Sequence, residues 1–108
     1  MRYLLLYYGA MPEDDAGRRA GMQLMADWYR TLGPGLVDGG NPFSAVRTVD
    51  VSGVRVASPE STPTGYTILD EADLDRAVEI ARGCPLIEHG RAIQLLEIFP
   101  AMEGASAA

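Results

Sequence analysis

The sequence contains no lysine, and all nine of its basic residues are arginines. This absence excludes enzymes that form a Schiff base through a lysine side chain, including pyridoxal-dependent enzymes. The uniform use of arginine is typical either of a GC-rich coding sequence or of side chains selected to hold anions. The net charge of −6 and the scattered arginines argue against nucleic acid as a partner, because phosphate binding needs clustered positive charge.

Cysteine and histidine occur once each, as Cys84 and His89. A single cysteine cannot form an intrachain disulfide, and this pair does not provide the ligand cluster of a zinc site. No run approaches the ~18 apolar residues of a membrane helix, and the apolar start MRYLLLYYG is too short for a signal peptide. We therefore expect a cytoplasmic protein that contacts no membrane and uses no metal or cofactor.

The length and composition are those of one small globular domain. The chain has 108 residues, of which 47% are hydrophobic and 22% charged, which is ordinary for a folded soluble domain. The last six residues, EGASAA, are small and polar. We expect one domain over residues 1–102 and a flexible tail over residues 103–108.

Two strand–helix–strand units can be read along the chain. The first has a helix that ends at Gly33-Pro34-Gly35 and is weakened at Gly21; the second has a helix over 74–81, capped by Asp73 and stopped by a left-handed Gly83. Alternating patterns predict strands at 2–8, 36–38, 65–70 and 92–99, with a hairpin of 45–51 and 54–57 between the units.

This order predicts a ferredoxin-like α+β fold, βαβ–hairpin–βαβ, with an antiparallel sheet and two helices on one face. The first and last strands, however, are apolar on both faces. Two helices cover only one face, and soluble monomers rarely expose a large apolar patch. We therefore expect a homodimer in which the two sheets pack face to face.

Several stretches together resemble the YCII-related (DGPF-type) domain family. They are the opening RYLLLYYG, the segment GYTIL at 65–69, the helix DLDRAVEIA at 73–81, the GCP stop at 83–85 and the His89-Gly90 entry into the last strand. The resemblance implies a dimeric α+β barrel, made of ferredoxin-like subunits. It carries over no catalytic residue, because the first helix has no histidine and Gln23 stands near the place where the family has one.

Asp38 and His89 are the candidate acid–base residues. Asp38 precedes Gly39-Gly40, where a carboxylate can approach a ligand closely; the same pattern is typical of an Asp-Gly turn. His89 is the only histidine, so any histidine acid–base role falls to it. Its place before the last strand also suits a plain turn residue.

Four further residues are candidate ligand-binding residues: Asn41, Ser44, Arg47 and Tyr7. Arg47 can hold a carboxylate through two parallel hydrogen bonds, or it can guard an exposed strand edge. Aromatic residues such as Tyr7 can line a site, although they more often pack in a core.

Three functions agree with the sequence. The first is binding of a small acidic or aromatic metabolite in a pocket near the dimer interface. The second is a cofactor-independent enzyme for proton transfer or elimination, with Asp38 or His89 as the base. The third is a non-catalytic oligomerisation module. A pocket with a convergent acid–base pair favours the enzyme, a pocket without one favours binding, and a filled pocket favours the module.

Overall fold

The computed structural model describes residues 1–101, and the predicted tail at 103–108 lies outside them. One antiparallel sheet has the strand order β2-β5-β1-β6, formed by β2 (Leu36–Asp38), β5 (Gly65–Asp70), β1 (Arg2–Tyr8) and β6 (Ala92–Ile98). The two long strands β1 and β5 are central, and β2 and β6 form the edges. This order and the two βαβ units are those of the predicted ferredoxin-like α+β fold.

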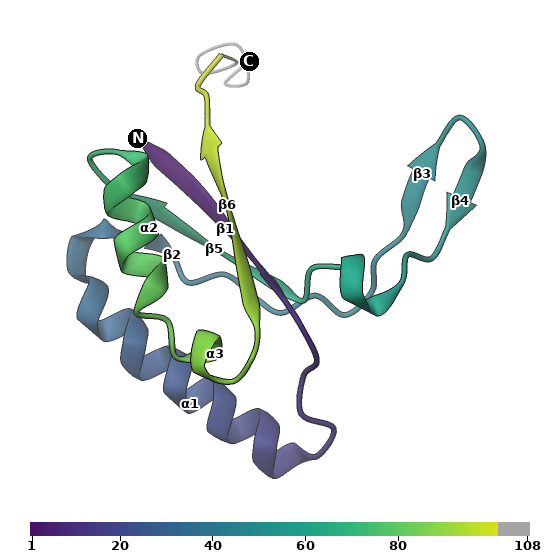
Figure 1. The fold of residues 1–108 in the computed structure, drawn as a ribbon, viewed down its shortest axis with the longest axis horizontal. Helices are drawn as coiled ribbons and strands as arrows, with labels where there is room; N and C mark the ends of the chain where they lie inside the picture. Colours follow the sequence, from purple (N-terminus) through teal and green to yellow (C-terminus); the bar gives the residue numbers. More distant parts are fainter. Residues whose placement is uncertain (102–108) are drawn as a thin grey trace.

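Helices cover one face of the sheet (Figure 1), namely α1 (Asp15–Leu32), α2 (Leu74–Arg82) and the short α3 (Pro85–Glu88). The core lies between them and the sheet. It contains Tyr3, Leu5 and Tyr7 of β1, which alternate with outward residues, and Trp28 of α1. The spacing of Met22, Met25, Tyr29 and Leu32 in the sequence predicts one apolar stripe on α1. This packing confirms it, except that Met22 is 68% exposed.

Both long helices begin at an aspartate cap. The carboxylate of Asp14 accepts a hydrogen bond from the Gly17 amide at 2.6 Å, and that of Asp73 from the Arg76 amide at 2.8 Å. The cap of α2 confirms the prediction. The weakening at Gly21 also predicts that the first helix begins firmly only near that residue. This prediction is wrong, because α1 begins at Asp15, where the Asp14 cap stabilises the first turn and offsets the effect of the glycine.

The end of α2 also differs from the prediction. Gly83 has φ −83° and is not left-handed, because the chain turns directly into α3, which begins at Pro85. The left-handed glycine comes later, at Gly90 with φ +75°, where α3 ends. The fold therefore has three helices on this face, where the sequence predicts two.

The predicted hairpin forms a separate two-stranded sheet of β3 (Thr48–Asp50) and β4 (Gly53–Arg55), shorter than expected. It is joined by the two-residue turn Val51-Ser52, with Gly53 at φ +125°. In Figure 1 the hairpin projects away from the body of the molecule, on the side of the sheet opposite the helices.

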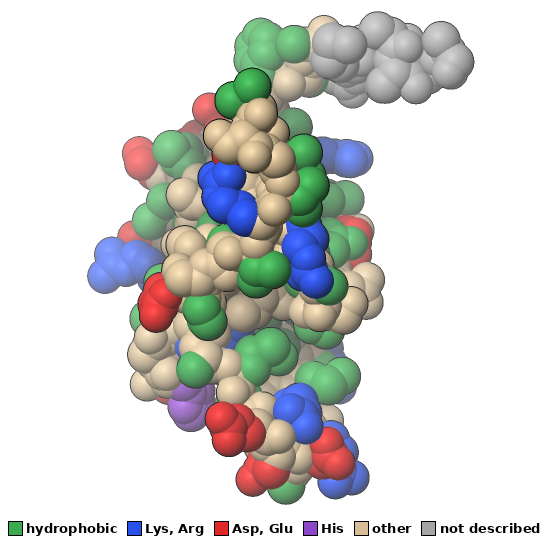
Figure 2. Space-filling model, turned by 90° about the vertical axis from the view of Figure 1, so that its right-hand side faces the viewer, with side chains coloured by type: hydrophobic (Ala, Val, Ile, Leu, Met, Phe, Trp, Pro, Cys, Tyr) green, Lys and Arg blue, Asp and Glu red, His purple; other side chains and the backbone are tan. Residues whose placement is uncertain are grey.

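The sheet face opposite the helices has no covering element in residues 1–101. We call it the open face. Its side chains come from the residues that alternate with the core positions, and they are mostly apolar or aromatic: Leu4, Leu6, Tyr8, Tyr66, Ile68, Leu96 and Ile98. Figure 2, viewed from the hairpin side, shows hydrophobic side chains interspersed with polar ones over this side of the molecule. The two-faced character of the first and last strands is thus confirmed.

Candidate functional site

Asp38 lies at the end of edge strand β2, where the predicted turn interrupts the pairing with β5. The pairing is irregular between Leu36 and Asp38, and the chain rejoins β5 only through a bridge between Pro42 and Gly65. Asp38 and Gly40 close this turn, because the Gly40 amide donates to Oδ1 of Asp38 at 2.8 Å. The Asp-Gly turn is therefore present, and the carboxylate remains exposed.

The second carboxylate oxygen of Asp38 accepts a hydrogen bond from the phenol of Tyr66 at 3.2 Å. Tyr66 in turn stacks on Phe43, with ring centroids 5.8 Å apart and an interplanar angle of 15°. Phe43 is fixed beside β5 because its amide donates to the Thr64 carbonyl at 2.8 Å. A carboxylate and two stacked rings thus adjoin at one edge of the open face. We call these three residues, Asp38, Tyr66 and Phe43, the aromatic–carboxylate site.

Gly40 allows the turn to approach β5 this closely. Its φ of +76° is in the left-handed region, and a Cβ at this position would lie 1.7 Å from the Tyr66 carbonyl oxygen. Glycine is therefore required by both the backbone conformation and the space. The sequence predicts that the glycines after Asp38 allow a close approach. They do, but the group that the Gly40 backbone approaches is the Tyr66 carbonyl of the protein itself.

Beneath this site, on the helix side of β5, a fully buried hydroxyl joins three elements. Oγ1 of Thr67 accepts from the hydroxyl of Tyr7 at 2.7 Å, shares a hydrogen bond with that of Tyr29 at 2.9 Å, and donates to the Gly39 carbonyl at 3.0 Å. A threonine hydroxyl has one donor and two acceptor positions, so all three are satisfied when Tyr29 donates. This network ties the turn at Gly39 to the core.

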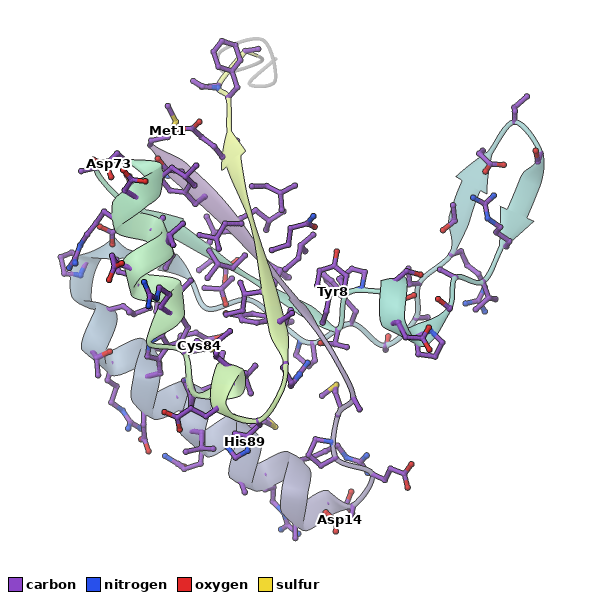
Figure 3. The ribbon with its side chains drawn as sticks, viewed as in Figure 1. Met1, Tyr8, Asp14, Asp73, Cys84 and His89 are labelled. Carbon is purple, nitrogen blue, oxygen red and sulfur yellow. The ribbon has the colours of Figure 1, made fainter. Side chains whose placement is uncertain are left out.

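The predicted acid–base residues are not brought together within one chain. Asp38 ends the edge strand β2, whereas His89 caps α3 and leads into the opposite edge strand β6. Three strand spacings of ~4.8 Å place these edges ~14 Å apart. Figure 3 shows His89 at the end of α3, among the helices, and its side chain is exposed. Asp38 is on the open face.

The predicted ligand-binding residues lie in three different environments. Asn41 is in the same turn as Asp38, and Ser44 follows Phe43 along the chain, both exposed. Arg47 is exposed near the base of the hairpin, and its guanidinium donates to the Val46 carbonyl at 2.9 Å. Tyr7 is only 4% exposed, and its hydroxyl is engaged by Thr67.

From the sequence, Tyr66 is one of several aromatic residues that could line a site, whereas Phe43 is not predicted as a binding residue. The sequence contains only local indications of these two residues. Tyr66 alternates with the core positions Gly65 and Thr67 and so lies on the other face of β5, and Phe43 follows the Asn41-Pro42 turn. Their adjacency depends on the Pro42–Gly65 bridge, which no local pattern specifies.

Two surface depressions lie elsewhere, on the helix side. One of about 450 Å³ lies between the end of α1 and α2 and is lined by Asp70, Glu71 and Arg76 among others. Another of about 400 Å³ lies between α2, α3 and β6 and is mainly apolar. Neither is lined by a predicted site residue. Within residues 1–101 no three His, Cys, Asp or Glu side chains gather as metal ligands, and no helix could cross a membrane.

Cys84 is buried, and Arg91, just before β6, is half-buried. Burial raises the pKa of the Cys84 thiol. Burial also lowers the pKa of the Arg91 guanidinium, which bonds to the Tyr8 carbonyl at 3.3 Å and to the Thr64 hydroxyl. Cys84 lies between α2 and α3 (Figure 3), packed in the core.

We expect the protein to lose stability in alkali. Burial raises the pKa of both Tyr7 and Cys84 in the folded state. The unfolded chain therefore releases these protons at lower pH than the folded one. The contribution to stability is present in full below the unfolded-chain pKa values, ~8.5 for cysteine and ~10 for tyrosine, and is lost progressively as pH rises above them toward the raised folded-state values. Urea unfolding at pH 7 and pH 10.5 measures this loss. It should be smaller in Tyr7→Phe and Cys84→Ala; an equal loss in wild type and both variants would contradict it.

Comparisons with known proteins establish the fold. No protein-family model matches the chain, and no curated protein matches it in sequence. Among solved structures it is similar to the 5-chloro-2-hydroxyhydroquinone dehydrochlorinase TftG from Burkholderia phenoliruptrix AC1100, in complex with 2,5-dihydroxybenzoquinone. The TM-score is 0.59 and the identity 14%, over 92% of this chain and 94% of that one. The chain thus shares the α+β fold of TftG.

Proposed function

We propose that this protein binds a small hydroxylated aromatic compound at the aromatic–carboxylate site. The observation that carries the proposal is the adjacency of an exposed carboxylate, Asp38, to the stacked rings of Tyr66 and Phe43. Stacked rings offer a π-face to another ring, and a carboxylate accepts hydrogen bonds from phenolic hydroxyls. The compound in the name of TftG, 5-chloro-2-hydroxyhydroquinone, is a hydroxylated aromatic ring, and the ligand in its structure is a hydroxylated quinone; both support the proposal.

The chemistry of the site favours a neutral phenol over an acidic ligand. Asp38 carries a carboxylate, the guanidinium of Arg47 donates to the Val46 carbonyl, and the whole chain has a net charge of −6. An anion would be repelled by the carboxylate, whereas a phenol donates to it. Of the acidic and aromatic ligands predicted, the aromatic one fits this geometry.

Binding fits the geometry better than acid–base catalysis. Each oxygen of Asp38 accepts one hydrogen bond, from Gly40 or from Tyr66, and keeps a lone pair that can accept from a phenol. His89, the other candidate base, lies beyond the opposite edge of the sheet. General acid–base catalysis needs its groups within hydrogen-bond reach of the same substrate, and the strand order keeps Asp38 and His89, the two predicted acid–base residues, at opposite edges of the sheet.

The proposal includes a homodimer of YCII-related type, in which the open faces of two copies pack together. The apolar open face supports it, since Leu96 and Ile98 are each 39% exposed and the centre is formed by Leu4, Leu6 and Ile68. An uncovered face of this kind in a soluble protein is typical of an interface. The aromatic–carboxylate site, at the β2 edge of that face, would then border the interface.

Titration calorimetry with catechol tests the ligand. We expect Asp38→Asn, which can keep the turn, and Phe43→Ala each to raise the Kd about 10-fold or more. Asp75→Asn and Phe99→Ala, exposed residues of the same types outside the site, should leave it unchanged. Veratrole, the dimethyl ether of catechol, should bind far more weakly because it has no hydroxyl to donate.

Two results would overturn the ligand proposal. One is equal affinity of all four variants for catechol, which would place binding elsewhere. The other is tighter binding of benzoate than of catechol, which would favour an acidic ligand. Absence of any aromatic binding by a stable dimer would leave oligomerisation as the function.

A further inference from the structure

The β3–β4 hairpin has one apolar face and one polar face. Val49 and Val54 are directly paired across the strands and are 72% and 68% exposed. Val56 follows in phase with Val54 and is 70% exposed, and Val51 at the tip is fully exposed. The other face contains Thr48 and the ion pair of Asp50 with Arg55. We call the four valines the valine face.

A two-stranded hairpin of this kind does not stabilise itself. Isolated hairpins are marginal in water, and three-residue strands such as β3 and β4 are short even for a hairpin. The hairpin forms its own sheet and does not join the main one. Four exposed valines on one short ribbon, with no core of their own, indicate a surface that is covered in the assembled protein.

The contact area that a stable dimer needs indicates that the valine face packs against a second copy of this chain. Strands of seven, three, six and seven residues, spaced ~4.8 Å apart with a rise of ~3.3 Å, give the open face a footprint of only ~360 Å². A stable interface needs ~800 Å² from each partner. The hairpin projects on the same side of the sheet as the open face (Figure 1), so its four exposed valines are the apolar surface that adds to this contact area.

We propose that the β3–β4 hairpin is a dimerisation arm, whose valine face packs on the partner subunit beside the contact between the two open faces. This inference rests on the homodimer of the proposed function and adds to it a second, reciprocal contact. The arrangement is isologous, so each copy contributes one arm and receives one. The polar face, with Asp50 and Arg55, then remains in water.

Sedimentation velocity over a concentration series tests the arm. We expect wild type to be a dimer and Val49→Ser/Val54→Ser to raise the dimer Kd about 100-fold, because two valines are lost from each of two arms. Met22→Ser is the matched control: Met22 is 68% exposed, as Val54 is, but lies on α1. It should leave the Kd unchanged. Circular dichroism confirms that the variants fold.

Isotope-filtered NMR gives an independent test. In a mixture of ¹³C-labelled and unlabelled chains, intermolecular contacts should connect the methyl groups of Val49 and Val54 to the partner. A wild-type monomer would overturn both the dimer and the arm. A wild-type dimer whose Kd is unchanged by Val49→Ser/Val54→Ser, with no intermolecular valine contacts, would overturn the arm alone and leave the open-face dimer standing.

Discussion

Replacing Thr67 with valine should lower the free energy of unfolding by about 3 kcal/mol, although valine has the same shape. The Thr67 side chain is fully buried, and its hydroxyl serves Tyr7, Tyr29 and the Gly39 carbonyl. Valine leaves these three polar groups without that partner, and burying unpaired polar groups costs ~1–3 kcal/mol each. Urea unfolding measures the change.

Thr62→Val is the control for this experiment. The Thr62 hydroxyl also donates to a backbone carbonyl, that of Ser58, at 2.8 Å, but in an exposed position where water can replace it. It should cost less than ~1 kcal/mol. If Thr67→Val and Thr62→Val had equal effects, the Thr67 network would not be what secures the Gly39 turn to the core.

Gly40→Ala should lower stability by about 3 kcal/mol and abolish catechol binding. The added Cβ would meet the Tyr66 carbonyl oxygen at 1.7 Å, a backbone atom that cannot move aside without displacing β5 or the turn. Because Gly40 also donates to Asp38, either displacement moves the carboxylate away from Tyr66. Thermal unfolding and calorimetry with catechol measure the two effects.

Gly21→Ala is the matched substitution. Gly21 lies inside α1, and a Cβ there would meet nothing within 4 Å. Alanine should therefore stabilise the helix by up to ~1 kcal/mol and leave binding unchanged. A Gly40→Ala protein with wild-type stability and affinity would show that the turn tolerates a side chain, contrary to this account.

Much of the fold could be predicted from sequence because its signals are local. Alternation places Tyr3, Leu5 and Tyr7 together on one face of β1, which the structure shows to be the core face, and Asp73 marks the start of α2 as its N-cap. Helix α3 cannot be predicted from the sequence, because its four residues, Pro85–Glu88, are too few to show a helical period. The start of α1 at Asp15 is set by one residue, the Asp14 cap, whose stabilising effect exceeds the destabilising effect of Gly21.

The candidate site could be predicted only in part. Asp38 and the glycines after it stand together in the chain, so their turn is visible in the sequence. Tyr66 is 28 residues further on, and it joins Asp38 because the chain returns to β5 beyond the turn. Long-range pairing of this kind leaves no local pattern. The distance between Asp38 and His89 is likewise set by strand order, which places β2 and β6 at opposite edges.

The most direct test of the central claim is a map of amide and methyl chemical shifts during a titration with catechol. The account predicts saturable shifts confined to the Asp38–Phe43 turn and the neighbouring part of β5 around Tyr66, on the open face. Shifts confined instead to the depression lined by Glu71 and Arg76, or to the apolar one between α2, α3 and β6, would contradict it. So would a titration that moves no signal at all.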